Sequence, residues 1–433
     1  MPDTSLQPLD PHHLRGKFPS LARLHNGHPV IYADAPGGTQ VPRAVTAAMT
    51  AYLETSNANF GGMFVTSRET GELVAQVRTG VKNLINAAAP EEIVFGQNMT
   101  SLTFAMSRAI ARTWQPGDEI IVTALDHDAN VAPWLLAAED RGVIVRTLPF
   151  DPRDATLSLE AFTALLGPRT RLVALGHASN AVGSIVNVQP LIAAAHRVGA
   201  LTYVDAVHYA PHGIIDVRAL DCDFLACSAY KFCGPHLGIL YGRQALLESL
   251  TAYKVRPSSA QPPGKWETGT QNTEAIAGLR AGLAYLGGLG AAASSDPLSP
   301  DPLSPDPLSP DPLSRAAFTC GMQRIIAHEA TLSRRFIAGL AALPGAHLYG
   351  ITDPARLGER TPTFGFTLAN CAPRQASERL AERGIFVWDG NFYATGVIDQ
   401  LGLAQHGGLI RIGFAHYNTL EEVEQVLAGL HRL

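Results

Sequence analysis

The sequence predicts an α/β protein with a mostly parallel sheet covered by helices on both faces, followed by a smaller C-terminal α+β domain. Through the middle of the chain, short apolar runs alternate with amphipathic stretches. That spacing is typical of βαβ crossovers, which place strands in parallel. After a proline-rich repeat, strands and helices mix without this alternation. The length of 433 residues accommodates two or three domains.

Each expected element follows from its apolar periodicity. The strands of the large sheet are expected at residues 92–95, 119–123, 143–147, 171–175, 201–204, 224–227 and 239–241. Helices are expected between them at 102–112, 131–141, 159–165 and 190–198, followed by two longer ones at 273–286 and 318–340. The C-terminal part is expected to hold strands at 363–368 and 409–413 and helices at 375–383 and 420–430.

The domain organisation is expected to follow these patterns. Residues 1–40 form an N-terminal arm packed with the small domain, 41–290 the large α/β domain, and 316–433 the small domain. Between the two domains, in residues 291–315, the sequence DPLS occurs four times with a period of five. Proline blocks helix and donates no ladder hydrogen bond, so this repeat is expected to be an extended, solvated linker.

Composition excludes several classes of function. Hydrophobic residues make up 46% and charged residues 16%, which is typical of a folded enzyme. The net charge is −5 and no basic block occurs, which argues against a nucleic-acid partner. No apolar run approaches the ~18 residues of a membrane span, and the N-terminus lacks a secretory pattern. Five cysteines without a C-x-x-C pair favour free thiols in the cytoplasm.

The scarcity of lysine narrows the search for an amine that could do chemistry. Only five lysines occur, and Lys231 stands just after the expected strand 224–227, beside the Gly234-Pro235 turn. Ligands of such sheets bind at the carboxyl ends of the strands, where desolvation lowers a lysine pKa and favours imine formation. Asp205 ends a neighbouring strand, where it could pair with a protonated pyridine nitrogen. Taken singly, each residue has an alternative: a surface loop lysine and a turn aspartate.

Two further patterns concern phosphate and metal ligands. Asn98 and Met99 follow a strand and open the helix expected at 102–112, and a helix N-terminus suits a phosphate dianion. The run 288–293 fits a G-x-G-x-x-A dinucleotide pattern but follows a helix rather than a strand, so we reject it. Asp126, His127 and Asp128 resemble a metal cluster, but nothing else in the sequence supports a metal.

Five motifs, in order, resemble one known family. They are DHDANVAPW (126–134), HASNAVG (177–183), LTYVDAVHYAPHGIIDVRALDCDFLACSAYKFCGPHLGILYG (201–242), WETGTQNT (266–273) and RIGFAHYNTLEEVEQVLAGL (411–430). Together they resemble the cysteine desulfurase and selenocysteine lyase family, whose members have the pyridoxal phosphate (PLP)-dependent fold type I of class V aminotransferases. The resemblance implies PLP as cofactor and a homodimer with sites at the subunit interface.

The resemblance also implies a role for particular residues. Lys231 is the imine-forming lysine and His127 stacks on the cofactor ring, and these two are the expected catalytic residues. Other cofactor contacts are expected from Asn98, Met99, Asn180, Asp205, Val207, His208, Ser228, Tyr230 and, from the neighbouring subunit, Thr270. The family usually has Gln at the position of His208 and His at that of Tyr230. Arg411 is expected to bind the substrate α-carboxylate, as a guanidinium can do in bidentate fashion.

The chain departs from the family at the nucleophile. Desulfurases carry a cysteine on a small-domain loop ahead of the carboxylate-binding arginine, and residues 384–394 contain none. Trp388, Asn391 and Tyr393 of this region are expected to line the substrate pocket, or alternatively only to pack in the loop. Arg68, in another glycine-rich loop, is a candidate for reading a second anionic group of the substrate.

We therefore expect an enzyme that deprotonates Cα of a cysteine-like amino acid and eliminates the β-substituent. The alternatives are a class V transaminase, an amino-acid epimerase, or a PLP-binding scaffold without turnover. The presence of Lys231, Asp205 and Arg411 together argues against the scaffold.

Overall fold

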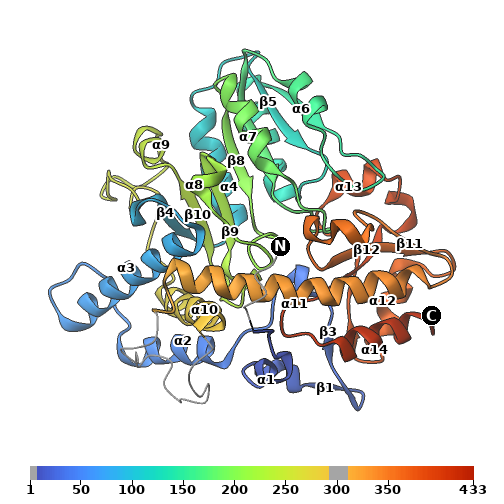
Figure 1. Ribbon diagram of the computed structural model, residues 1–433. Coiled ribbons are helices and arrows are strands. Elements are labelled where there is room, and N and C mark those ends of the chain that lie inside the picture. Colours follow the sequence, from blue (N-terminus) through green and yellow to red (C-terminus); the bar gives the residue numbers. More distant parts are fainter. Residues whose placement is uncertain (1–6, 292–310) are drawn as a thin grey trace.

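The computed structural model describes residues 7–291 and 311–433 (Figure 1). Its central sheet has seven strands in the order β4-β10-β9-β8-β7-β5-β6. The strands are β4 (Ile93–Gly96), β5 (Glu119–Thr123), β6 (Ile144–Leu148), β7 (Thr170–Gly176), β8 (Leu201–Asp205), β9 (Phe224–Ser228) and β10 (Gly238–Gly242). Strand β10 runs antiparallel to both of its neighbours, and the pairs from β9 to β6 are parallel. The mostly parallel sheet expected from the sequence is confirmed.

Helices cover both faces of this sheet because its strands are apolar on both sides. Ile120 of β5 packs in one core with α4 (Met99–Ala111) and α5 (Ala132–Arg141). Its neighbour Ile121 packs in the other core, with α6 (Leu159–Leu165) and α7 (Val188–Arg197). Alternate side chains of one strand therefore supply two separate cores, as expected for a buried sheet. The remaining helices of this part are α2 (Arg43–Thr55), α3 (Val65–Ile85), α8 (Val217–Leu220) and α9 (Gln244–Ser249).

Two long helices, α10 (Thr273–Ala291) and α11 (Arg315–Ala341), pack against each other, and α11 continues to the second sheet (Figure 1). Helix α10 runs five residues beyond the expected end at residue 286. Glycines permit this close packing, since a Cβ on Gly290 would lie 2.3 Å from the Ala317 carbonyl oxygen. The run 288–291 is therefore helical, not a dinucleotide loop.

Most of the DPLS repeat, residues 292–310, lies outside the described residues. The last unit, 311–314, forms a turn rather than the extended chain expected for the repeat. Ser314 caps α11 by accepting a hydrogen bond from the Ala317 amide, and Asn83 of α3 donates to the Leu313 carbonyl at 2.8 Å. This unit is anchored because its carbonyl and hydroxyl groups find partners on two helices.

A second, antiparallel sheet has the order β11-β12-β15-β14. Its strands are β11 (Ala346–Leu348), β12 (Thr363–Leu368), β14 (Trp388–Gly390) and β15 (Leu409–Gly413). Its apolar face packs against α11, α12 (Pro373–Ala381) and α14 (Leu420–Leu430), with Phe336, Phe364 and Phe414 in the core. A short helix, α13 (Thr395–Gln400), follows β14.

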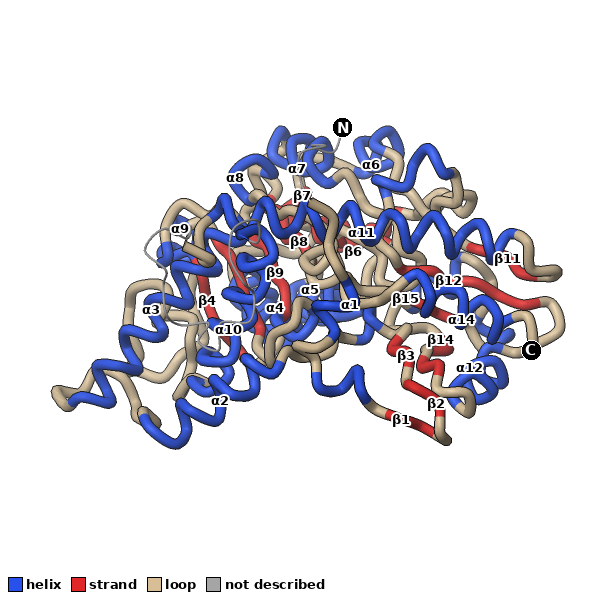
Figure 2. Tube along the Cα trace, turned by 60° about the horizontal axis from the view of Figure 1, so that its bottom comes forward, coloured by secondary structure: helices blue, strands red, loops and turns tan. Residues whose placement is uncertain are grey.

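The N-terminal segment lies beside the second sheet (Figure 2), and its residues Asp34 and Pro36 contact the end of β15 and Lys231. Its elements are α1 (Pro11–Arg15), β1 (Leu24–His25), β2 (His28–Pro29) and β3 (Ile31–Tyr32). Strand β3 pairs in parallel with β13 (Ile385–Phe386), and Asp34 forms a bridge with Gly413 at the end of β15. Among the described residues, no helix is long and apolar enough to span a membrane.

Candidate active site

Loops at the carboxyl ends of β5, β7, β8 and β9 meet the end of β15 and the N-terminal segment. His127, Asn180, Asp205 and Lys231 each follow or end one of these strands, and Arg411 lies on β15. Crossover topology forces this convergence, because parallel strands end on the same edge of the sheet. Five residues from separate parts of the sequence therefore surround one site.

Lys231 lies in a short 3₁₀ turn after β9, and its side chain is buried. Its ammonium donates to the Pro36 carbonyl oxygen at 2.5 Å. Burial lowers the Lys231 pKa to about 7, and the nearby Arg411 guanidinium lowers it as well, against the opposing effect of Asp205 and Asp34. A large fraction of the amine is therefore neutral and nucleophilic near pH 7.

Asp205 ends β8 with a buried carboxylate. It accepts a hydrogen bond of 2.8 Å from the Val207 amide, which fixes the orientation of the carboxylate. Burial raises the Asp205 pKa to about 6, which the Val207 amide and Lys231 partly offset. A buried carboxylate of this kind gains most from a cationic N–H partner, because no water compensates its charge.

The N-terminus of α4 forms a narrow cradle against the ends of β9 and β10. Asn98 caps the helix by accepting from the Ser101 amide at 2.8 Å, and Ser228 accepts from the Met99 amide at 3.1 Å. A Cβ on Gly238 would lie 2.4 Å from the Asn98 backbone, so only glycine allows β10 to approach. The positive end of α4 and the Ser228 hydroxyl suit a phosphate group.

His127 is held in one orientation. Its Nδ1 accepts from the Ala129 amide at 3.0 Å, so the proton of the neutral ring lies on Nε2. Burial, together with Lys231 and Arg411, lowers the His127 pKa to about 4, which keeps the ring neutral at pH 7. Tyr393 stacks on this ring, with the two centroids 5.4 Å apart and the planes 21° from parallel.

The buried Arg411 guanidinium has a hydrogen-bond donor that no protein group occupies. Its Nη1 donates to the Asn180 carbonyl at 3.0 Å, and its Cζ lies 4.3 Å above the centre of the Phe392 ring. Within residues 7–291 and 311–433, neither Arg411 Nε nor Asn180 Oδ1 has a hydrogen-bond partner. Burial lowers the Arg411 pKa to about 10, so the group stays charged at neutral pH. An unpaired donor on a buried cation indicates an anionic ligand.

His208 and Tyr230, both expected to contact the cofactor, already have protein partners. His208 Nε2 lies 3.0 Å from the Thr363 hydroxyl and 3.2 Å from that of Thr361, so this ring nitrogen faces the second sheet. The Tyr230 ring stacks on His236 at 4.9 Å, with the Lys231 amine 4.8 Å from its own centre. Tyr230 nevertheless adjoins the site through Lys231.

Four other expected residues are exposed. Trp388 starts β14 and is 53% exposed. Asn391 lines an open cleft of about 260 Å³ with Asp399 and Gly408, which contains none of the residues around Lys231. Thr270 lies in the loop before α10 and Arg68 on α3, and α3 lies at the opposite end of the molecule from β14 (Figures 1 and 2). Within the described part of the chain, Asn391, Thr270 and Arg68 make no hydrogen bond or ion pair to Lys231, His127, Asp205 or Arg411.

The segment 34–39 forms a wall of the site that the sequence did not predict. Pro36 binds Lys231, and Gly37 leaves room for Trp388 and Arg411, since its Cβ would lie 3.1 Å from Trp388 Nε1 and 3.9 Å from Arg411 Nη2. The Asp34 carboxyl is buried, which raises its pKa to about 6 against the opposing charge of Arg411. The Ala-Pro-Gly-Gly run at 35–38 was the available signal, since paired glycines indicate close backbone approach.

The five cysteines are all free, and four of them are buried. Cys233 follows Lys231 by two residues, but burial raises its pKa to about 12 and its backbone amide is bound by Thr39 at 2.8 Å. Burial likewise raises the pKa values of Cys222 and Cys227 to about 12. Cys371 lies in a turn after β12 and precedes the loop 390–394 in the chain. Cys222, Cys227 and Cys233 therefore lack the low-pKa setting of a reactive thiol, and Cys371 is buried.

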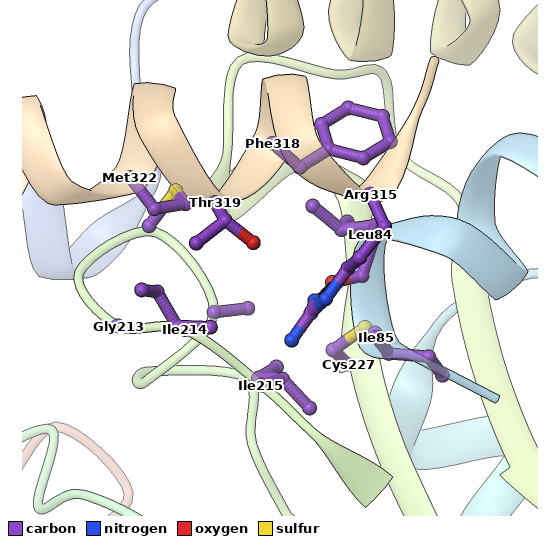
Figure 3. Close-up of a pocket in the computed structure, with 11 residues that line it drawn as sticks. Leu84, Ile85, Gly213, Ile214, Ile215, Cys227, Arg315, Phe318, Thr319 and Met322 are labelled. Carbon is purple, nitrogen blue, oxygen red and sulfur yellow. Dashed lines mark hydrogen bonds between the residues drawn. The ribbon is translucent and has the colours of Figure 1, made fainter. Parts of the chain in front are cut away.

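A second, smaller cavity is lined by Ile214, Ile215, Cys227, Phe318 and Met322, among others (Figure 3). Its volume of about 10 Å³ is close to that of one water molecule. It has no residue in common with the Lys231 site and is too small for an amino acid. Among the residues that the structure describes, no cluster of three or more His, Cys, Asp or Glu is arranged for a metal ion.

The residues around Lys231 fit PLP. The fit rests on the half-neutral Lys231 amine, the buried Asp205 carboxylate, the flat neutral His127 ring, and the α4 cradle that Gly238 keeps open. The unpaired Asn180 Oδ1 and Arg411 Nε add one acceptor and one donor for further polar groups. This donor set matches an aldehyde, a pyridine nitrogen and a phosphate in a single ligand.

Comparisons with known proteins agree with this site. The model of the class-V aminotransferase family matches residues 31–297 and 315–426. A cysteine desulfurase of Dickeya dadantii is 31% identical over 441 residues, covering 98% of this chain and 97% of the relative. One from Pectobacterium carotovorum is 32% identical, covering 97% of each.

Solved structures give the same result. A crystal structure of an Escherichia coli cysteine desulfurase superposes with a TM-score of 0.81 at 26% identity, over 98% of each chain. The apo structure of a cysteine desulfurase from Thermococcus onnurineus gives 0.83 at 26% identity, over 100% of this chain and 99% of the other. The chain belongs to the class-V aminotransferase family and is a PLP-dependent enzyme.

Proposed function

We propose that this enzyme is a cysteine desulfurase-like C–S lyase, which releases the sulfur of a cysteine-like amino acid by β-elimination. One observation carries the choice of elimination over transfer to an enzyme thiol. The loop 384–394 contains no cysteine, and Cys233, the thiol nearest in sequence to Lys231, is buried with a pKa of about 12. The two relatives named above are cysteine desulfurases, which supports a cysteine-like substrate.

The residues would divide the work as follows. Asp205, His127, Ser228, Asn98 and Met99 would hold PLP, which when bound supplies an electron sink for negative charge at Cα. Two further residues, Asn180 and His208, would lie beside it.

The remaining steps belong to two side chains of the site. Arg411 would bind the α-carboxylate through its free Nε edge, which orients the Cα–H bond toward the lysine. The Lys231 amine, with its pKa of about 7, is suited to accept the Cα proton and to return a proton to the departing thiolate. Trp388 and the exposed face of Tyr393 would exclude water from the mouth of the site.

Incubation of the purified enzyme with cysteine, cystine and other amino acids tests the proposal. Elimination from cysteine predicts pyruvate, ammonia and sulfide in equal amounts. Alanine would show sulfur transfer to a thiol and would overturn the proposal. An oxo acid with an aminated cofactor would indicate a transaminase, inversion at Cα an epimerase, and an unreactive yellow protein a scaffold.

We also propose a homodimer. Apolar side chains are exposed together just before and at the start of α3, at Phe60, Met63, Phe64 and Val65. Met63 is 88% exposed, and such a patch on a folded chain favours a protein partner. In a dimer, Thr270 and Arg68 would serve the site of the other copy. Sedimentation of wild type and Phe64→Asp tests this: a wild-type monomer would refute it.

We propose a cytoplasmic location, which the five free thiols support. Fractionation of the host cell with detection of the native protein is the test, and recovery outside the cytoplasm would refute it.

A further inference from the structure

The loop that lacks the cysteine contains an unusual dipeptide, Phe392-Tyr393. Both residues have left-handed backbone, with φ of 53° and 58°. This conformation is unfavourable for aromatic side chains, and two consecutive examples persist only where surrounding contacts enforce them. Several of these contacts come from Asn180, Arg411 and the loop that carries His127.

The backbone of the dipeptide is tied to two loops of the large sheet. The Phe392 carbonyl accepts from Asn180 Nδ2 at 2.8 Å, and the Tyr393 carbonyl accepts from the Asp128 amide at 2.7 Å. Asn391 completes the turn by accepting from the Tyr393 amide at 3.1 Å. The second sheet is thereby fastened to the loops that follow β5 and β7.

The two side chains then reach different functional groups. The buried Phe392 ring lies beneath the Arg411 guanidinium, 4.3 Å from ring centre to Cζ. The Tyr393 ring stacks on His127 and remains 70% exposed. A stacked neighbour restricts the plane of an imidazole, and the face of a buried aromatic ring attracts a buried cation.

From this geometry we propose that Phe392 and Tyr393 are positioning residues with separate tasks. Phe392 orients Arg411 for the substrate carboxylate, and Tyr393 holds the plane of His127 against the cofactor. The inference rests on the roles proposed above for Arg411 and His127. It gives Tyr393 a task other than the one expected from the sequence, which was to line the substrate pocket.

Variants that separate ring from backbone test the proposal. Tyr393→Asn tolerates left-handed backbone but removes the ring, and Tyr393→Phe keeps the ring. We expect Tyr393→Asn to weaken PLP affinity by about three- to tenfold with little change in the Kd for the amino acid, and Tyr393→Phe to stay within about twofold. Tyr253→Asn, which removes another exposed aromatic ring beside Arg108 and Arg112, is the matched control.

Phe392→Leu should show the opposite pattern, with the Kd for the amino acid raised about five- to thirtyfold and PLP affinity unchanged. Phe392→Met provides a second variant of similar volume if the first does not fold. PLP affinity and amino-acid binding are both read from the visible absorbance of the cofactor, which needs no turnover. The proposed elimination can therefore fail while this test still decides.

The crossed pattern is the diagnostic result. Equal losses of PLP affinity and substrate binding in both variants, accompanied by a lower Tm, would show a merely structural loop and overturn the proposal. Unchanged binding in both variants would overturn it as well.

Discussion

Replacement of Arg411 by Met tests the carboxylate site most directly. One nitrogen of the guanidinium is occupied by the Asn180 carbonyl at 3.0 Å, while Nε is buried without a partner. The free edge can make two charge-assisted hydrogen bonds, each contributing about 1.5–3 kcal/mol. Loss of about 3–6 kcal/mol corresponds to roughly a 10²- to 10⁴-fold lower kcat/KM.

The assay measures the steady-state turnover of cysteine by the amount of pyruvate released. Arg411→Lys keeps the charge without the planar fork and should lose less than Arg411→Met. Arg374→Met removes an exposed arginine that pairs with Glu378 on α12, and serves as the control.

The Arg411→Met variant carries a second signature, in the pH profile. Arg411 disfavours the ammonium form of Lys231, so its removal raises the Lys231 pKa and shifts the rising limb of activity to higher pH. A folded, PLP-loaded Arg411→Met enzyme with less than tenfold loss would refute the assignment.

Three further predictions concern the cofactor site and its support. Capture of PLP by the apoprotein requires neutral Lys231, so its rate should rise with pH through about 7 and then level, and a rise continuing to pH 10 contradicts the lowered pKa. Gly238→Ala places a Cβ 2.4 Å from the backbone at the start of α4 and should weaken PLP binding at least about tenfold, whereas Gly288→Ala, with open space, should not. Glu267→Ala leaves the buried Arg78 without the carboxylate that lies 2.8 Å from it, and should destabilise the fold by about 3–5 kcal/mol, measured by urea unfolding; a change below about 1 kcal/mol would count against it.

The parts of the fold that depend on local pattern were predictable. The expected strand at 119–123 matches β5 at both ends, and 409–413 matches β15. The apolar run 120–122 lies between Glu119 and Thr123, and Leu409 directly follows the glycine pair 407–408. Lys231 and Asp205 were then chosen as candidate site residues because they lie at the carboxyl ends of expected strands. The C-terminal end of α10 was predicted five residues too early, because the glycines after residue 286 favour a helix end. In the structure these glycines permit close contact with α11.

Contacts between distant segments were not predictable in this way. Nothing local to Pro36 indicates that its carbonyl binds an amine 195 residues away. Phe392 likewise resembles an ordinary loop aromatic, and its place under Arg411 depends on the folded position of two sheets. The partners of His208 on and beside β12 arise for the same reason, since sequence pattern defines elements and not the side chains that meet across them.

The N-terminal segment also has a consequence for the order of folding during synthesis. Tyr32 accepts a hydrogen bond from Asn418, 386 residues later in the chain, and Arg15 donates to Tyr417. At ~5–20 residues per second, the ribosome needs on the order of 20–80 s to make that interval. The segment that includes Pro36 is therefore synthesised first but reaches its place in the site last. The seven-stranded sheet can form before Lys231 acquires its contact with Pro36.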